Sequence, residues 1–340
     1  MLKRVRAEEA VGMILGYDVT QVIPGLKKGP VFKKGHRIRE EDIKVFLDTG
    51  NEYIWVIELK EGELHEDEAA LELAKSVSGE NLSLQSGGEG RVLIKAEANG
   101  LLKVERGLLE ELNLKGDFVL STLRDNTPCK KGETVGVAKV IPLIIREEEL
   151  EWVRERFSGK KVLYLKVYRE RRVGVIVTGD EVYFGRIKDG FDQQVLPKLK
   201  EYGLVPFKKL VLPDDPQKIA QAIRELVEEG CDLLILTGGL SIDPGDVTRE
   251  GVKLAGASIV NYGAPVVPGT NFLYALLDGV DILGLPACVY YNRRTIFDVV
   301  LPRLLASERL SKEEIRRLGY GGLCLGCENC HFPHCHFGMP

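Results

Sequence analysis

Two stretches of this chain run from an apolar segment directly into a Thr-Gly turn that is followed by acidic residues. The first covers residues 174–180, with the sequence GVIVTGD, and the second covers residues 232–239, with the sequence DLLILTGG. Continuous apolar runs of this kind indicate strands that are buried on both faces of a parallel sheet. In open α/β sheets, ligands bind outside the carboxyl ends of the strands. The two turns therefore predict one pocket, for a phosphate-bearing ligand and a divalent metal.

Several aspartates lie in the loops that leave these strands. Mg²⁺ usually takes one or two carboxylates and fills its other positions with water and phosphate oxygens. Glycines let the backbone approach a phosphate, and helix N-terminal amides bind it. The same aspartates could instead be turn formers and helix N-caps. Because three strand ends converge, we favour a functional role for the set, which comprises Asp180, Asp189, Asp214, Asp215, Asp243 and Asp246.

Other catalytic motifs are absent or incomplete. Residues 239–243 begin like a Gly-x-Ser-x-Gly nucleophile elbow but end in Asp243, and the histidines after them all lie in the C-terminal tail. This argues against a serine hydrolase, and Ser241 is then a ligand hydrogen-bond donor or a loop residue. The chain has no Walker A motif and no Gly-x-Gly-x-x-Gly after a strand, which disfavours P-loop and dinucleotide chemistry.

The last residues of the chain gather four cysteines with short, regular spacing. Such a set in a reducing compartment indicates a metal site rather than a disulfide framework. Four soft ligands suit tetrahedral Zn²⁺ or an iron–sulfur cluster, and the spacing leaves both open. Three histidines, at positions 331, 334 and 336, lie among them. The predicted metal ligands are Cys324, Cys327, Cys330 and Cys335.

A basic stretch near the N-terminus offers a second place for an anion. We favour the simpler interpretation that these charges belong to a solvated surface loop. The stretch contains Lys27, Lys28, Lys33, Lys34, His36, Arg37 and Arg39.

The bulk composition excludes several classes of protein. The chain has 340 residues, 44% of them hydrophobic, and 47 basic against 51 acidic residues give a net charge of −4. This balance argues against broad nucleic-acid binding, which needs a basic surface. We find no 18-residue apolar run for a membrane span and no apolar leader at the N-terminus. We therefore expect a cytoplasmic protein that does not associate with membranes.

The pattern of the chain predicts four parts. Residues 1–75 are expected to form a small mixed α/β domain, with loops at residues 24–25 and 27–30. Residues 76–150 read as short strands broken by Gly and Asn, which favours a small β-barrel or sandwich. A charged helix over residues 146–157 follows.

From residue 171 to residue 306 strands and helices alternate, which predicts a doubly wound, mostly parallel α/β sheet. Helices are expected over residues 191–201, 216–229 and, despite Pro302, 295–305. In the remaining part, residues 307–340, a capping box at Ser311 opens a short helix before the cysteine-rich tail.

Five motifs in this α/β part occur in an order that we recognise. It resembles the molybdopterin-binding (MoaB/Mog) domain of molybdenum cofactor biosynthesis, which occurs in molybdopterin adenylyltransferase and in molybdopterin molybdenumtransferase. The motifs are Thr178-Gly179-Asp180-Glu181, Leu212-Pro213-Asp214-Asp215-Pro216, Thr237-Gly238-Gly239-Leu240-Ser241 with Asp246-Val247-Thr248, Val267-Pro268-Gly269, and Gly284-Leu285-Pro286.

The resemblance implies a site and a chemistry. Molybdopterin would be the ligand or substrate, Mg²⁺ the metal, and the reaction either adenylyl transfer from ATP to molybdopterin or insertion of molybdate with loss of AMP. Asp214 and Asp246 would be the functional carboxylates. Residues of the other motifs would bind the cofactor: Thr178, Gly179, Asp180, Asp215, Thr237, Gly238, Gly239, Ser241, Pro268, Gly269 and Pro286. The resemblance also implies a homo-oligomer and other molybdenum cofactor proteins as partners.

Two loops depart from the molybdenumtransferase pattern. That enzyme has Pro-Gly-Lys-Pro where this chain has Pro268-Gly269-Thr270-Asn271, and Leu-Pro-Gly-Asn-Pro where this chain has Leu285-Pro286-Ala287-Cys288-Val289. Whether the protein is an enzyme therefore stays open. The alternatives are a non-catalytic cofactor binder or sensor with a metal-binding tail, and a nucleotide hydrolase on the related domain of competence-damage proteins.

Overall fold

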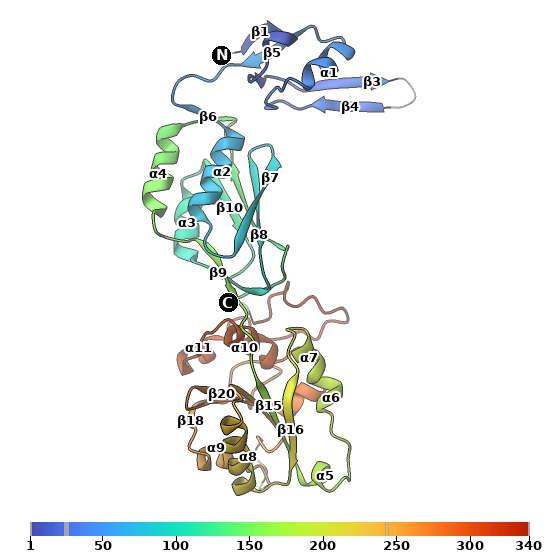
Figure 1. Cartoon of the computed structure of the whole chain (residues 1–340), viewed down its shortest axis with the longest axis vertical. Helices are drawn as coiled ribbons and strands as arrows, with labels where there is room; N and C mark the ends of the chain where they lie inside the picture. Colours follow the sequence, from blue (N-terminus) through green and yellow to red (C-terminus); the bar gives the residue numbers. More distant parts are fainter. Residues whose placement is uncertain (1, 24–26, 242, 244, 339–340) are drawn as a thin grey trace. The chain divides into compact units, whose positions relative to one another are not determined.

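The chain folds as two compact units in the computed structural model, which describes residues 2–23, 27–241, 243 and 245–338. Unit 1 comprises residues 1–97, 104–123 and 132–164, and unit 2 comprises residues 98–103, 124–131 and 165–340. Figure 1 labels their helices and strands. Within the described residues, every helix is too short or too polar to cross a bilayer.

The first part of unit 1 is antiparallel. Strands β1 (Leu2–Arg6), β5 (Tyr53–Ile57) and β2 (Ile14–Leu15) form one sheet, and β3 (Val19–Ile23) pairs with β4 (Lys27–Phe32) in a hairpin. The loop expected at residues 27–30 is therefore wrong, because Lys27 to Pro30 pair with β3. The loop expected at residues 24–25 lies outside the described residues. The helical elements are η1 (Ala7–Glu9) and α1 (Asp42–Asp48).

The second part of unit 1 is an open antiparallel sheet rather than the expected barrel or sandwich. The sheet has the order β10-β12-β8-β7, and helix α2 (Glu66–Val77) packs on it through alanines and Leu73. A helix with such a narrow apolar face covers one side of the sheet, so the strands need not close on themselves. The strands are β7 (Leu82–Gly88), β8 (Arg91–Ala96), β10 (Phe118–Thr122) and β12 (Thr134–Val140).

Short elements complete this region. The charged helix predicted at residues 146–157 is α4 (Glu147–Phe157). Helix α3 (Arg106–Leu114) was not predicted. The remaining strands of unit 1 are β6 (Glu63–His65) and β13 (Ile144–Arg146), which pair with each other. Strand β11 (Pro128–Cys129) lies in unit 2, as do most residues of β9 (Gly100–Val104) and β14 (Leu163–Val167).

Unit 2 contains the predicted α/β sheet, with six strands in the order β16-β15-β17-β20-β19-β18. The first four strands in this order are parallel, and the last two pair antiparallel at one edge. The strands are β15 (Val173–Thr178), β16 (Pro206–Leu212), β17 (Leu233–Thr237), β18 (Ser258–Tyr262), β19 (Leu273–Leu277) and β20 (Val280–Leu285).

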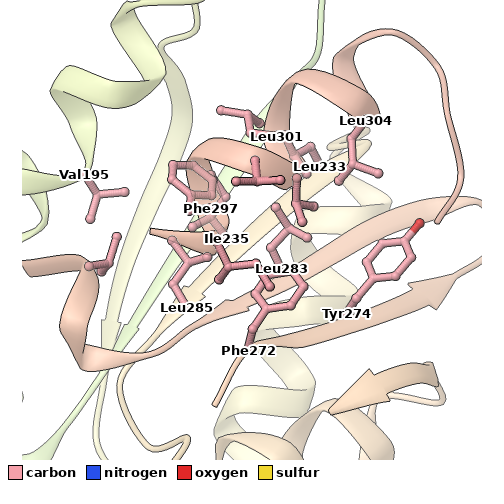
Figure 2. Close-up of a cluster of buried hydrophobic side chains, with 14 of the residues drawn as sticks. Val195, Leu233, Ile235, Phe272, Tyr274, Leu283, Leu285, Phe297, Leu301 and Leu304 are labelled. Atoms are coloured by element: carbon pink, nitrogen blue, oxygen red, sulfur yellow. The ribbon is translucent and has the colours of Figure 1, made fainter. Parts of the chain in front are cut away.

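Helices cover both faces of this sheet, as the continuous apolar runs require. Because side chains alternate along a strand, Val175 and Ile235 face one core while Ile176 and Leu236 face the other. Figure 2 shows Phe297, Leu301 and Leu304 of one covering helix pointing onto the strands. The helices of the first face are α6 (Phe191–Gln194), α7 (Leu196–Lys200), α10 (Ile296–Leu305) and α11 (Lys312–Arg317), and those of the second are α8 (Pro216–Glu228) and α9 (Thr248–Leu254).

This arrangement creates a crevice at the carboxyl end of the sheet. The chain leaves β15 toward α6 and α7 on one face, and leaves the neighbouring strand β17 toward α9 on the other. Connections that diverge in this way open the space in which α/β sheets bind ligands. The two Thr-Gly turns of β15 and β17 lie at this point, with the short helix α5 (Asp180–Tyr183) following the first.

Two helices differ in detail from expectation. The single helix predicted over residues 191–201 is divided into α6 and α7, because Pro197 lacks the N–H that would continue the hydrogen-bond ladder. Helix α10 runs through Pro302 as predicted, and Thr295 caps it. Helix α11 begins at the capping box of Ser311, also as predicted.

The opposite, amino end of the sheet is held by a buried ionic network. Arg171 donates to the Asp281 carboxylate at 2.6 Å and to the carbonyl of Asp232 at 2.6 Å, and the Tyr274 hydroxyl donates to Asp281 at 2.7 Å. The Arg171 side chain is fully buried. Two buried charges that satisfy one another are costly to separate, because the remaining charge keeps its desolvation penalty. This network therefore joins the starts of β15, β17 and β20.

We predict that Asp281→Asn lowers the free energy of unfolding of unit 2 by about 2 kcal/mol, because Arg171 then keeps only the partly exposed Asp232 carboxylate, at 3.0 Å. The matched control Asp278→Asn, in the β19–β20 turn, should change it by less than about 0.5 kcal/mol. Both tryptophans, Trp55 and Trp152, lie in unit 1, so urea denaturation should be followed by far-UV circular dichroism. Equal effects of the two substitutions would contradict the assigned role.

Candidate functional site

The two predicted strand ends are tied together by threonine hydroxyls. The Thr178 hydroxyl donates to the carbonyl of Thr237 at 3.3 Å and lies 3.0 Å from the Thr248 hydroxyl, which donates to the carbonyl of Gly238 at 2.9 Å. All three threonines are buried. Thr178 and Thr237, predicted to bind the cofactor, thus hold the two loops in register beneath the surface.

Gly238 allows the closest approach between these loops. Its φ is +92°, and a Cβ added there would lie 2.2 Å from the carbonyl oxygen of Thr178. No side chain fits such a contact, and an L-residue also resists this backbone conformation. The neighbouring Gly239 is equally confined, since its Cβ would lie 2.5 Å from the Thr248 hydroxyl oxygen. The Gly-Gly pair is therefore a geometric requirement of the turn.

A pocket of about 430 Å³ opens beside this turn. It joins seven of the predicted site residues, from three separate loops: Gly238, Gly239, Ser241, Asp246, Pro268, Gly269 and Pro286. Of the described residues that line it, none is a lysine or an arginine, and Asp246 is the one charged side chain. The volume falls within the range of small-molecule sites.

A second group of predicted residues forms an acidic edge next to the pocket, outside its lining. The amide of Asp180 donates to the Asp214 carboxylate at 3.1 Å, and the amide of Asp214 donates to the Asp180 carboxylate at 3.1 Å. Gly179, whose amide donates to the carbonyl of Leu212 at 3.2 Å, joins β15 to this edge. The reciprocal bonds hold the ends of β15 and β16 side by side.

Asp214 is the electrostatically strained member of this edge. One of its carboxylate oxygens is buried and finds no hydrogen-bond partner among the described residues. Burial raises the pKa of Asp214, a hydrogen bond from the Asp180 amide opposes the rise, and the charges of Asp180, Glu181 and Asp246 add to it. The negative charges of the acidic edge are therefore not neutralised. Asp246 both adds to the charge acting on Asp214 and lines the pocket.

Asp246 itself is positioned by its own loop. Its carboxylate accepts a hydrogen bond from the amide of Asp243 at 2.8 Å, and its amide donates to the carbonyl of Asp243 at 2.9 Å. This small turn holds Asp246 in the wall of the pocket.

Two other aspartates of the predicted set have structural partners instead. Asp215 is the N-cap of α8, where its carboxylate accepts from the amides of Gln217 at 2.9 Å and Lys218 at 3.2 Å. Asp189 accepts from the amide of Phe191 and from the Lys209 ammonium group. For these two the simpler role of cap and turn former accounts for the contacts.

The pocket is also lined by four residues that were not predicted to belong to the site. Thr270, Asn271, Ala287 and Cys288 all line it, and they are the positions at which two motifs depart from the molybdenumtransferase pattern. Asn271 donates to the Ser241 hydroxyl at a long 3.5 Å. Burial raises the pKa of the Cys288 thiol. The differences from the molybdenumtransferase pattern could therefore have been used to predict these residues of the pocket wall.

The four tail cysteines are free thiols. Cys324 and Cys335 are half-buried, whereas Cys327 and Cys330 are exposed. Over the described part of the chain, no three Cys, His, Asp or Glu side chains are gathered closely enough to hold a metal. The predicted tail ligands are near one another in sequence without forming a preassembled cage.

The basic stretch near the N-terminus is largely paired with acids of unit 1. Lys33 pairs with Glu89, Arg37 with Glu68, and His36 with Asp42. Paired charges of this kind fit the interpretation of a solvated surface. The side chains of Lys27 and Lys28 fall outside the described residues.

Comparison with known families places the pocket in a domain. Residues 174–306 match the family model described as "Probable molybdopterin binding domain". The match covers less than half of the chain. All the lining residues of the pocket and the whole acidic edge lie within this domain. Residues 4–58, in unit 1, match "Domain of unknown function (DUF8806)".

Curated relatives are similar to part of this chain. A CinA-like protein of Amoebophilus asiaticus is 33% identical over 125 residues, which is 36% of this chain and 28% of the relative. A CinA-like protein of Mycobacterium avium is 33% identical over 90 residues, covering 26% of this chain and 21% of the relative. The chain thus spans about a fifth to three tenths of the length of these relatives.

Solved structures with a similar fold include the molybdopterin biosynthesis enzyme MoaB of Thermus thermophilus. The two sequences are 19% identical, and the match has a TM-score of 0.35 and covers 41% of this chain and 98% of that one. A molybdenum cofactor biosynthesis protein of Pyrococcus furiosus covers 93% of this chain and 65% of its own, with 12% identity and a TM-score of 0.26.

We predict that Asp214→Asn raises the melting temperature at neutral pH. A carboxyl group with a raised pKa binds more protons in the folded than in the unfolded state, so its contribution to stability falls as pH rises above the unfolded value of 3.8. At neutral pH the ionised group therefore destabilises the fold, and asparagine removes that charge while its oxygen still accepts from Asp180. The gain should vanish at acid pH, where both side chains are neutral.

Thermal melts of both proteins across a pH series, with and without Mg²⁺, test this prediction. Mg²⁺ should raise the melting temperature of the wild type and leave Asp214→Asn unchanged. A lower melting temperature for the variant at neutral pH would contradict the electrostatic account.

We predict that Gly238→Ala lowers the free energy of unfolding by about 2–4 kcal/mol, because the new Cβ collides with the Thr178 carbonyl. The matched control is Gly185→Ala, which has φ +72° and open space around the new Cβ, so it should cost only the conformational term of about 1 kcal/mol. Denaturant titration of both variants provides the measurement. If the two losses are equal, the close approach is not what requires glycine.

Proposed function

We propose that the pocket binds molybdopterin and that the protein takes part in molybdenum cofactor synthesis or handling. The main support for this proposal is the position of the pocket. The Gly-Gly turn, the Pro268 loop and the Pro286 loop meet around one cavity inside the domain that matches the molybdopterin-binding family. The apolar walls, including Leu240, Val267 and Leu285, suit a flat pterin ring, and the glycines suit close approach of a phosphate.

The charges of the site require a cation for this ligand. The pocket contributes one carboxylate and no basic side chain among its described lining residues, so a bound phosphate would face Asp246 and the acidic edge uncompensated. Mg²⁺ usually takes one or two carboxylates and completes its shell with water and phosphate oxygens. Asp214, with its unpartnered oxygen, and Asp246 are the groups that fit this role. Mg²⁺ would there neutralise the phosphate charge.

The roles of the remaining residues follow from their positions. Asp180 would orient Asp214 through the reciprocal backbone bonds, and Ser241 would donate a hydrogen bond to the ligand from the pocket wall. Thr178, Thr237 and Gly179 would support the turns. Asp215 would act through α8, whose N-terminus it caps next to Asp214.

Binding and turnover are separate questions at this site. Thr270 occupies the position of the lysine in the molybdenumtransferase pattern, so a cation that could neutralise charge during transfer is missing from the lining. Purified protein supplied with molybdopterin, molybdate, ATP and Mg²⁺ distinguishes the roles. Adenylylated molybdopterin or released AMP with molybdenum insertion would identify a transferase, and tight binding without product would identify a binder or sensor.

A second candidate function is nucleotide hydrolysis. The observation that favours it is the 33% identity to CinA-like proteins over 125 residues of the chain. Release of product from ADP-ribose or a nucleotide under conditions in which molybdopterin fails to bind would decide for this candidate.

We predict that Asp246→Asn weakens Mg²⁺-dependent molybdopterin binding at least about tenfold, which corresponds to about 1.4 kcal/mol. The variant should stay folded, because the asparagine oxygen still accepts from the amide of Asp243. Anaerobic titration followed by pterin fluorescence gives the affinity, and any turnover should be lost as well. EDTA should bring the wild type to the level of the variant.

Asp117→Asn, an exposed aspartate of unit 1, is the control and should bind as the wild type does. Wild-type affinity or full activity of Asp246→Asn would reject its assigned role.

A further inference from the structure

The cysteine-rich tail is held as a closed loop. The amide of Gly338 donates to the carbonyl of Gly321 at 2.9 Å, and a ring nitrogen of His336 lies 2.9 Å from the carbonyl of Leu323. Next to this closure the Phe337 side chain is buried in the core of unit 2. Gly338 packs so tightly on Val299 that a Cβ would come within 2.3 Å of it. The base of the loop is therefore fixed by both hydrogen bonds and packing.

All four tail cysteines lie inside this closed loop. Two of them, Cys324 and Cys335, pack against the hydrophobic core near its base, and Cys327 and Cys330 lie exposed between them. Bringing distant ligands together normally costs loop-closure entropy. Here the fold has already brought the two ends of the ligand segment to its base, so only the exposed middle of the loop has to turn inward.

Positive charge is available beside the thiols. The Arg293 guanidinium donates at 2.6 Å to the carbonyl of Glu328, which lies between Cys327 and Cys330 in the chain. Arg294 stacks over the Phe332 ring at 5.1 Å, but its guanidinium is already paired with Glu201 and Asp298. Four thiolates around a divalent ion carry excess negative charge, which Arg293 would partly offset.

The same loop is hydrogen-bonded to the wall of the pocket. The amide of Val267 donates to the carbonyl of Gly322 at 2.8 Å, and the amide of Cys324 donates to the carbonyl of Val267 at 2.8 Å. Val267, Pro268 and Gly269 then line the pocket. The backbone of one cysteine of the loop is thus hydrogen-bonded to Val267, which lines the pocket. Arg293 follows η2 (Ala287–Tyr290), which supplies Ala287 and Cys288 to another wall.

We propose that the loop closed by Gly321 and Gly338 is a thiolate metal site, and that metal in this loop and ligand in the pocket strengthen one another's binding. The second half of the proposal rests on the proposed function of the pocket. Metal coordination by Cys324 would order the bridge to Val267 and so fix the Pro268 wall in its binding arrangement. Coupling of this kind is reciprocal, so ligand in the pocket must raise the metal affinity by the same factor.

The metal site is tested on the full-length protein purified anaerobically. We expect about one metal site per chain, with colourless zinc or a brown iron–sulfur cluster, and either supports the site. Cys327→Ser combined with Cys330→Ser should lower the metal content to below about a tenth, since two thiolates cannot complete the site. Cys231→Ala, a core thiol outside the loop, is the control and should keep the wild-type content.

Metal-free wild-type protein, or full metal content in the double variant, would overturn the site. Co²⁺ replacing Zn²⁺ gives a second readout that does not depend on activity, because thiolate coordination produces visible absorption. Its absence in a zinc-binding preparation would likewise count against thiolate ligands.

The linkage is measured as the molybdopterin affinity of metal-loaded and metal-free protein. We expect the loaded form to bind at least about fivefold more tightly, and the double cysteine variant to show no response to metal. Equal affinity of the two forms would overturn the linkage alone, while the pocket function would stand. Failure of both forms to bind molybdopterin would overturn the proposed function and the linkage, and the metal content would still decide the site.

Discussion

The site depends on the contact between the ends of β15 and β17. Two neighbouring strands send their chains to opposite faces of the sheet, and the turn after β17 has to pass within contact distance of the Thr178 carbonyl. Only glycine permits that passage, and the hydroxyls of Thr178 and Thr248 hold it in place. The position of Asp246, which lies two residues before Thr248, is fixed by the same contact. Ligand geometry in this domain is therefore set by buried hydroxyls beneath the pocket.

At the carboxyl end of the sheet, the clustered acidic side chains destabilise the folded protein. The pKa of Asp214 is raised by burial and by other acids, and one of its oxygens has no partner among the described residues. At the amino end, by contrast, the charge of Arg171 is paired with the carboxylates of Asp281 and Asp232. A fold that compensates charge at one end and leaves it uncompensated at the other is typical of a binding edge, because groups that wait for a ligand are destabilising without it.

Much of this could be predicted from the sequence, for identifiable reasons. Continuous apolar runs marked β15, β17 and β20, and the Thr-Gly turns marked their carboxyl ends. The hairpin strand at Lys27–Phe32 was missed because Gly29 and Pro30 are typical of turns, although an edge position tolerates both. Pro216 at the start of α8 makes Asp215 the N-cap, which a sequence pattern can reveal, whereas the buried, unpartnered oxygen of Asp214 depends on tertiary packing. Cysteine spacing also does not say whether the thiols are already gathered, because that depends on loop conformation.

The buried network of Arg171, Asp281 and Tyr274 has a consequence for sequence change at the other end of the sheet. It lies across the starts of three strands, far along the sheet from the pocket loops. Loop residues such as Thr270, Ala287 and Cys288 can therefore be exchanged without loosening the strands that carry them. The domain is thus suited to acquiring new ligand preferences by substitution in these loops, with the sheet serving as an unchanging frame.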